Sequence, residues 1–372
     1  MTLHIFNPEH DIVLASGLSN FTAPHAARQL RHDLCYLPSL WAGPADAVLV
    51  DDVEQARHAA RRWKPQAQFV SKHQLCHLPI DRIEPWGWNS ALRAFLLRYG
   101  VEQSLLPTEA MLSHIRALSH RRTAAWLLSR LCTIGGTVGE AVECTTPEAV
   151  DRQLQAWGRA VIKAPWSSSG RGVRYAGTAT AAPDSVDLCA YYTNGWLRNV
   201  IARQGSIMVE PYYKKVKDFG MEFFADGKGG ARYEGLSLFH TDAGAYTGNV
   251  LATEQAKRQQ LLRFISGDVL EAVQQTICQT MGEACRDKYC GPFGVDMMVV
   301  ADRSLKSEGG SLRSLKSEGG SLTSSLIPQP SSLIPQPSAL IPHPSTFSIL
   351  PTLPTLIRNL LGINELFSVG NV

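Results

Sequence analysis

The chain has 372 residues, of which 44% are hydrophobic and 19% are charged, so it is long enough for two or three domains and apolar enough to bury a core. Its formal net charge is +3 and its basic residues are scattered, which argues against nucleic acid as a partner. The eight cysteines include no CxxC pair, which predicts reduced thiols in a cytoplasmic protein without a zinc site.

The N-terminal part, residues 1–115, alternates short strand-like and helix-like segments, a pattern typical of a small α/β domain. It lacks the features of a signal peptide, and no apolar run in the chain reaches membrane-spanning length, so no membrane partner is expected. The polar segment from Asn7 to Asp11 follows the first expected strand. We interpret this segment either as turn and capping chemistry or as part of an acceptor site.

A second domain is expected over residues 116–302, with a mostly antiparallel sheet. Ser119 is expected to cap a helix that runs to Leu131, and Thr146 to cap a second helix that ends near Gly158. A long helical stretch is expected over residues 254–285. The expected strands are 160–164, 206–210, 219–225, 231–239 and 293–300, the third and fourth forming a hairpin.

The strongest chemical feature is a strand that ends in Lys163 and runs into a loop of small residues. Serine and glycine let several backbone N–H groups turn toward one phosphate group, and a lysine on a rigid strand neutralises phosphate charge. The lysine precedes the glycines, so this is not a Walker A loop, and a plain surface loop is the alternative. The loop residues with a predicted phosphate role are Ser167, Ser168, Ser169, Gly170, Arg171 and Gly172.

Three acids follow the loop on apolar strands. Glu210 ends one strand and Glu222 lies in the next, where each either binds a nucleotide or is merely solvated. Asp296 lies inside a strand, where a buried carboxylate needs a partner; Mg²⁺ or an arginine would supply it. The Gly-rich segment 235–249 is interpreted either as a lid over the acceptor substrate or as an ordinary hairpin loop.

In this order, the elements of residues 115–302 resemble the ATP-grasp superfamily, which includes D-alanine:D-alanine ligase, biotin carboxylase and glutathione synthetase. The resemblance implies ATP and Mg²⁺ as cofactors and a small-molecule carboxylate as substrate. The carboxylate would become an acylphosphate that an amine or similar nucleophile attacks. The implied roles are phosphate binding by Lys163 and by Arg121 or Arg122, adenine binding by Glu210, ribose binding by Glu222 and metal binding by Asp296.

The sequence departs from the family pattern after Asp302. A ten-residue unit stands at 303–312 and again, unchanged, at 313–322, and Pro-containing seven-residue units follow. We expect residues 303–372 to be a repeat-derived tail, extended and largely disordered, that is dispensable and leaves the last sheet edge open. The family's distal Glu-x-Asn strand is missing. The sequence therefore predicts a ligase that binds ATP but turns over poorly, or alternatively a nucleotide-binding protein without catalysis.

Overall fold

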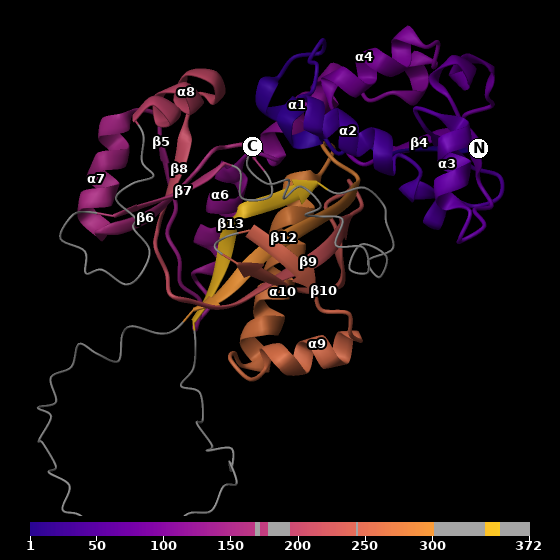
Figure 1. The fold of residues 1–372 in the computed structure, drawn as a ribbon. Helices are drawn as coiled ribbons and strands as arrows, with labels where there is room; N and C mark the ends of the chain where they lie inside the picture. Colours follow the sequence, from indigo (N-terminus) through magenta and orange to yellow (C-terminus); the bar gives the residue numbers. More distant parts are fainter. Residues whose placement is uncertain (168–171, 178–193, 243–244, 301–338, 350–372) are drawn as a thin grey trace, which may run out of the picture.

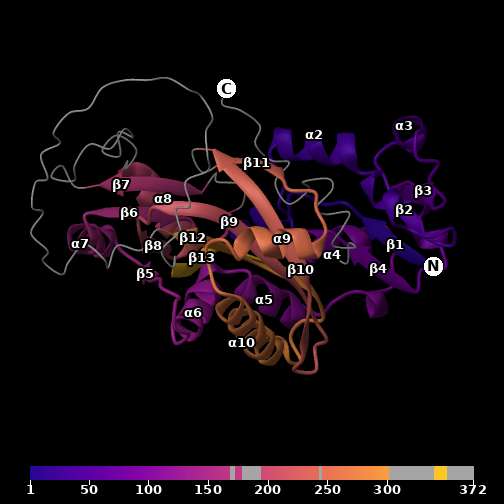
Figure 2. The same ribbon diagram turned by 90° about the horizontal axis from the view of Figure 1, so that it is seen from below.

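The computed structural model describes residues 1–167, 172–177, 194–242, 245–300 and 339–349 of the chain (Figure 1). These residues form three β-sheets flanked by helices, which confirms the predicted mixed α/β class with a largely antiparallel second part. Sheet A has the order β3-β2-β1-β4, sheet B the order β11-β10-β9-β12-β13, and sheet C the order β5-β8-β6-β7. In both views, sheets A and C lie on opposite sides of sheet B (Figures 1 and 2). None of the helices in the described part is both long and apolar enough to cross a bilayer.

Sheet A is parallel throughout and takes up the N-terminal part of the chain. Its strands are β1 (Thr2–Ile5), β2 (Ala47–Leu49), β3 (Gln68–Val70) and β4 (Arg82–Pro85). The α-helices among and after them are α1 (His10–Ser16), α2 (His25–Leu34), α3 (Val53–Ala60) and α4 (Ser90–Arg98). Short 3-10 helices are η1 (Leu37–Leu40), η2 (Lys72–His77) and η3 (Gln103–Leu105). Because the strands are parallel, the segments that follow β1, β2 and β4 start from the same edge.

Helices α5 (Glu109–Leu118) and α6 (Arg121–Leu131) lead from sheet A to the rest of the chain. The prediction that Ser119 caps the second of these helices is wrong. Ser119 is instead the C-cap of α5, and its hydroxyl donates back to the carbonyl of Ile115 at 2.8 Å. The His120 ring instead accepts the backbone N–H of Arg122 at 2.9 Å and caps α6.

Sheet C is antiparallel and carries two helices. Its strands are β5 (Val142–Cys144), β6 (Arg159–Lys163), β7 (Val173–Gly177) and β8 (Ile207–Pro211). Its helices are α7 (Pro147–Trp157) and α8 (Asn194–Gln204). The predicted cap of α7 is confirmed, because the Thr146 hydroxyl accepts the N–H of Ala149 at 3.2 Å. Gly158 ends the helix with a φ of 72°, a conformation that glycine adopts without strain.

Sheet B is antiparallel and central. Its strands are β9 (Lys215–Ala225), β10 (Ala231–Asp242), β11 (Ala245–Asn249), β12 (Gly291–Val300) and β13 (Ala339–Ile349). The predicted hairpin is confirmed by the pairing of β9 with β10. The predicted long helical stretch is two helices, α9 (Glu254–Leu261) and α10 (Gly267–Cys285), because Ser266 accepts the N–H of Val269 and starts a new helix.

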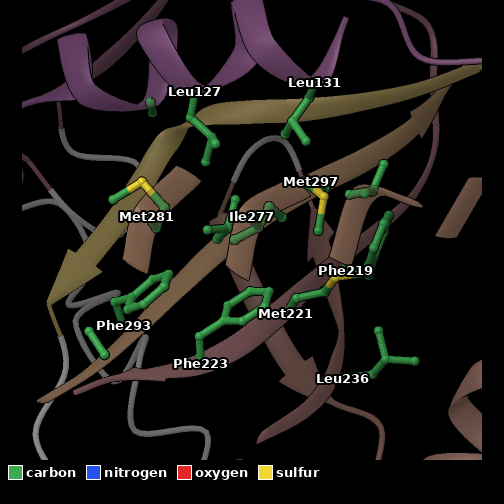
Figure 3. Packing of buried hydrophobic residues seen from close by; sticks show 14 of the residues in the cluster. Leu127, Leu131, Phe219, Met221, Phe223, Leu236, Ile277, Met281, Phe293 and Met297 are labelled. Atoms are coloured by element: carbon green, nitrogen blue, oxygen red, sulfur yellow. The ribbon is translucent and has the colours of Figure 1, made fainter. Parts of the chain in front are cut away.

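The two faces of sheet B differ sharply in polarity. Odd-numbered residues from Phe219 to Ala225 in β9 and from Phe293 to Val299 in β12 are apolar and pack against α6 and α10 (Figure 3). Phe223 stacks on Phe293 in this core, with ring centroids 5.2 Å apart. On the opposite face, the even-numbered positions 218–222 of β9 and 294–296 of β12 carry glycines and carboxylates. Period-two alternation in the sequence therefore separates a core face from a polar face.

Strand β13 corrects the expectation of an open sheet edge. Residues 339–349 pair antiparallel with β12 from Val300 back to Phe293, with a register shift between Val295 and Met297. Proline is tolerated at an edge because one side of an edge strand has no ladder partner, and prolines two residues apart can share that side. The predicted disorder of residues 303–338 and 350–372 concerns residues outside the described part of the chain.

Pairing of β13 with β12 predicts that the tail stabilises sheet B. We expect a chain ending at Asp302 to unfold at lower urea concentration than the full chain and to scatter more light, because the β12 edge becomes unpaired. The matched control is a full-length chain whose residues 339–349 are replaced by glycine and serine. Equal urea midpoints for all three chains would contradict a stabilising role for β13.

Candidate functional site

A buried ion pair lies on one face of sheet C. Lys163 ends β6, and its Nζ donates to Oε2 of Glu210 in β8 at 2.5 Å. The register pairs Val161 with Glu210 and Lys163 with Met208, so the two charged residues are diagonal neighbours on the same face. Their side chains are only 1% and 6% exposed. The strand lysine and the strand-end acid that the sequence singled out separately are therefore brought into direct contact.

The burial of this pair changes the pKa of its lysine. Desolvation lowers the pKa of Lys163 to about 8; the Glu210 carboxylate opposes this fall and the Arg121 guanidinium adds to it. In the described part of the chain, the second oxygen of Glu210, Oε1, is buried and accepts no hydrogen bond. The pair thus places a lysine with a lowered pKa beside an acceptor oxygen, and both are enclosed within the protein.

Arg121 braces the start of the phosphate loop. Its Nε donates to the carbonyl of Ala164 at 2.7 Å, and its Nη2 donates to the carbonyl and hydroxyl oxygens of Ser167 at 2.7 and 2.9 Å. The third nitrogen, Nη1, is buried and has no hydrogen-bond partner in the described ranges. Because α6 begins at Arg121, the helix, the end of β6 and the loop are joined by one side chain.

Burial lowers the pKa of the Arg121 guanidinium to about 10, and the carboxylates of Glu210, Asp11 and Asp296 oppose this fall in that order. These three acids come from sheet C, from α1 and from sheet B. The guanidinium therefore lies where the three parts of the chain meet, within electrostatic reach of a carboxylate from each.

The described ends of the loop are tightly packed. Trp166 donates its indole N–H to the carbonyl of Arg116 at 2.9 Å, and the Arg116 guanidinium lies 3.9 Å from the Trp166 ring centroid. A Cβ on Gly172 would lie 2.2 Å from the Ser167 hydroxyl, so glycine is required for this close approach. The predicted phosphate residues between them, Ser168, Ser169, Gly170 and Arg171, lie outside the described residues.

Two of the predicted site carboxylates lie on the polar face of sheet B. Asp296 in β12 stands opposite Gly220 in β9, and Glu222 in β9 stands opposite Gly294 in β12. A Cβ on Gly220 would lie 2.8 Å from Asp296 Oδ1, and one on Gly294 would lie 2.8 Å from Glu222 Oε2. The glycines thus give each carboxylate room to lie across the neighbouring strand, so the sheet presents a diagonal pair of acids.

Contacts connect this polar face with sheet C. Tyr213, just after β8, packs against Met298, which lies two residues beyond Asp296 in β12. Burial, then Tyr212, then the carboxylates of Asp218 and Glu210 raise the pKa of Tyr175 in β7. Since Tyr175 responds to an acid of each sheet, the ion-pair face of sheet C and the polar face of sheet B border one shared region.

Not every predicted residue lies in this region. Arg122 is 58% exposed in its side chain and donates to Glu143 of β5 at 2.8 Å, so of the two candidate arginines only Arg121 is at the site. Asp218, which begins the sequence segment that carries Glu222, is buried and accepts hydrogen bonds from Lys215 at 2.6 Å and Thr241 at 2.7 Å.

The Gly-rich segment 235–249 lies largely in two strands of sheet B. Residues up to Asp242 and from Ala245 to Asn249 form strands β10 and β11, and residues 243–244 between them lie outside the described part. In the ranges that the structure covers, no cluster of three or more His, Cys, Asp or Glu side chains could hold a metal ion.

Comparisons with known proteins give structural neighbours only. No protein-family model and no curated protein sequence matches the chain. The ADP complex of N5-carboxyaminoimidazole synthetase from Staphylococcus aureus matches 82% of this chain and 68% of its own, at 12% identity and a TM-score of 0.39. N5-carboxyaminoimidazole ribonucleotide synthetase from Thermus thermophilus matches 80% and 67%, at 12% identity and a TM-score of 0.44. D-alanyl-alanine synthetase A from Vibrio cholerae matches 81% and 85%, at 13% identity and a TM-score of 0.41.

All three TM-scores are below 0.5, so the function proposed below rests on the residues of the chain itself. The match spans about two thirds of the length of the two carboxyaminoimidazole enzymes.

The lowered pKa of Lys163 predicts a pH dependence of stability. Below pH 8 the lysine is charged in both the folded and the unfolded chain, and the cost of burying the charge is fully present. Between about pH 8 and 10.5 the unfolded chain binds more protons, so the free energy of unfolding should rise with pH. Urea titrations of the wild type and Lys163→Met test this: the free energy of unfolding of the wild type, relative to that of the variant, should increase as pH rises through this window. A difference independent of pH would contradict the buried, partly deprotonated lysine.

Proposed function

We propose that the chain binds ATP between sheets B and C and that it is of the ATP-grasp ligase type, joining a carboxylate to an amine or similar nucleophile. The observation that carries the proposal is the buried Lys163 cation with Arg121 beside it, bordering the same region as the Asp296 and Glu222 carboxylates. Two buried cations suit a polyphosphate, and the facing carboxylates suit the metal ion that accompanies it.

Unused hydrogen-bonding capacity at the site supports a nucleotide. Arg121 Nη1 is a buried donor and Glu210 Oε1 a buried acceptor, and neither has a partner among the described residues. A phosphate oxygen would satisfy the first, and an exocyclic amino group such as that of adenine would satisfy the second. Leaving such groups unpaired costs about 1–3 kcal/mol each, so a bound ligand that pairs both would gain this free energy.

Lys163 and Arg121 would hold different parts of the triphosphate region. Lys163 is on a strand of sheet C, so its position relative to the phosphates is fixed by the sheet ladder. Arg121 also anchors the carbonyl groups at the loop entrance, so phosphate binding and loop position would be coupled through one guanidinium. The loop, when closed over the phosphates, would exclude water from the reacting oxygens.

The metal side of the proposed site is incomplete. Asp296 and Glu222 would hold one Mg²⁺, which neutralises charge on the phosphates when bound. Strand β13 lies beside β12, where a further ligand strand would lie, but its sequence Ala-Leu-Ile-Pro-His-Pro-Ser-Thr-Phe-Ser-Ile contains no Asp, Glu, Asn or Gln. The strand thus completes the sheet without adding a carboxylate or amide ligand.

The reaction itself requires no protein nucleophile. A substrate carboxylate oxygen attacks the γ-phosphorus of ATP, the bond to the β-γ bridging oxygen breaks, and ADP leaves with that electron pair. An amine then attacks the acyl carbon, phosphate departs, and a base takes the proton from nitrogen. The protein residues position the reacting groups and neutralise their negative charge. A missing metal-ligand set therefore has its largest effect on charge neutralisation in the transition state.

ATP binding is tested by thermal unfolding. We expect MgATP at millimolar concentration to raise the melting temperature of the full chain, because a ligand that binds only the folded state stabilises it. Lys163→Met should remove most of this shift. A double variant, Lys163→Met with Glu210→Gln, should also lose the shift while leaving no unpaired carboxylate in the interior.

The matched control is Lys257→Met, because Lys257 is the other buried lysine of the described residues and lies in α9. This variant should be destabilised yet keep the ATP-induced shift. If the wild type shows no shift, or if the Lys163 variants keep it in full, ATP does not bind at this site.

Turnover is expected to separate from binding. We expect ATP consumption to be slower by on the order of a thousandfold than in a chain with a complete metal-ligand set, because charge stabilisation of the phosphoryl transition state is lost. Coupled measurement of ADP release with a pool of carboxylates and amines checks this. A graft that replaces the residues after Asp302 with a strand bearing Glu-x-Asn should restore Mg²⁺-dependent turnover. Ligase activity in the unchanged chain would contradict the impairment and leave the binding proposal intact.

A further inference from the structure

The carboxyl edge of sheet A holds a set of polar side chains that the nucleotide site does not use. Asn7 and His10 follow β1, Asp51 follows β2, and Asn89 follows β4. In parallel sheets this edge is where ligands bind, because the strand ends and the loops after them leave room there. The cluster includes the segment from Asn7 to Asp11 that the sequence left open between turn chemistry and an acceptor site.

Three interactions fix the ring of His10. The amide of Asn89 contacts its Nδ1 at 3.1 Å. A Cβ on Gly87 would lie 2.5 Å from the ring carbon Cγ, so only glycine lets the ring lie against this backbone. Asn7 holds Gly87 in turn, donating to its carbonyl at 2.8 Å and accepting its N–H at 3.2 Å. The ring is therefore positioned by two strand ends rather than by chance packing.

The contact with Asn89 also fixes the tautomer of His10. The Asn89 Oδ1 is already used, because it accepts the N–H of Leu92 at the start of α4. The group that meets His10 Nδ1 is thus the amide nitrogen, a donor, so Nδ1 is the acceptor and the proton of the neutral ring is on Nε2. Burial lowers the pKa of His10 and so favours the neutral ring, while the Asp11 carboxylate opposes this fall.

The Nε2–H is then a buried donor without an acceptor. His10 is 5% exposed, and no described residue makes a hydrogen bond to Nε2. A histidine that served only to fill the core would carry this unpaired donor at a cost of about 1–3 kcal/mol. Phenylalanine would fill a similar volume without that cost. The unpaired donor therefore suggests a bound ligand that accepts its hydrogen bond.

The position of His10 links sheet A to the proposed nucleotide site. Asp11, the next residue, interacts electrostatically with both His10 and Arg121. Helix α1, which carries both residues, also contacts α8 of the sheet C unit. A ligand at His10 would therefore lie on the side of sheet A that faces the phosphate-binding guanidinium.

We propose that the His10 Nε2–H donates a hydrogen bond to a carboxylate oxygen of the acid substrate, which binds at the carboxyl edge of sheet A. The inference rests on the proposed function. An ammonium group has no acceptor lone pair and cannot satisfy this donor, whereas a carboxylate can. His10 is thus a substrate-binding residue, and Asn89 and Gly87 are the residues that position it.

The test uses the full chain labelled with ¹⁵N in its histidines, and the His10 Nε2 resonance is identified by its loss in His10→Phe. The probes are acetate, succinate and glycine, each with and without ADP and Mg²⁺, and methylammonium serves as a cation without an acceptor. We expect at least one carboxylate to move the Nε2 resonance and methylammonium to leave it in place. In His10→Phe the affinity for that carboxylate should fall roughly tenfold or more, while the melting temperature is equal or higher.

A second variant separates binding from a structural role. Asn89→Ser keeps a capping oxygen for α4 but removes the amide donor to Nδ1, so it should keep the melting temperature and weaken the carboxylate response. The inference is overturned if no carboxylate moves the Nε2 resonance while ADP still stabilises the chain. Absence of any ADP effect would instead contradict the proposed function, and the carboxylates tested alone would still decide the role of His10.

Discussion

The buried guanidinium of Arg121 is the interaction on which the arrangement of the site depends. It begins α6, it holds the carbonyl groups of Ala164 and Ser167, and it is within reach of acids from sheets B and C and from α1. A guanidinium suits this place because it stays charged when buried and offers five donors in a rigid plane. A lysine has only three donors on a single nitrogen, so it could not make the same three hydrogen bonds to Ala164 and Ser167 and keep a further N–H directed elsewhere.

The Lys163–Glu210 pair is difficult to explain by stability alone. Taking both charges out of water costs several kcal/mol per ion, and their attraction offsets this only when the remaining polar atoms are satisfied. Here Glu210 Oε1 has no partner in the described part of the chain, so the offset is incomplete. Apolar residues of similar volume would serve sheet C at least as well. This cost agrees with the nucleotide-binding role proposed for the pair, because functional sites commonly keep groups that stability alone would not favour.

The sequence predicted the elements whose signals are local. The cap of α7, the β9–β10 hairpin and the strand that carries Asp296 all follow from residue spacing and turn chemistry. It could not choose between Arg121 and Arg122, because adjacent helical positions differ by about 100° and only the packing of α6 shows which one turns inward. The diagonal pairing of Glu222 and Asp296 was equally hidden, because it depends on the register between two strands that are about seventy residues apart.

The prediction of an open sheet edge beside β12 is wrong for a different physical reason. Pairing of main-chain groups and binding of a metal ion make different demands on a strand. The edge of β12 presents main-chain N–H and C=O groups, and these pair with any extended segment, largely without regard to its side chains. Repeat sequence with β-branched and aromatic residues such as Ile341, Thr346 and Phe347 can therefore take the edge position, although it was not expected to. A metal site makes the opposite demand, because it needs particular oxygen ligands at particular positions. Strand β13 meets the first requirement, and its sequence has no Asp, Glu, Asn or Gln, so pairing of the sheet edge does not by itself supply the metal ligands that the proposed function needs.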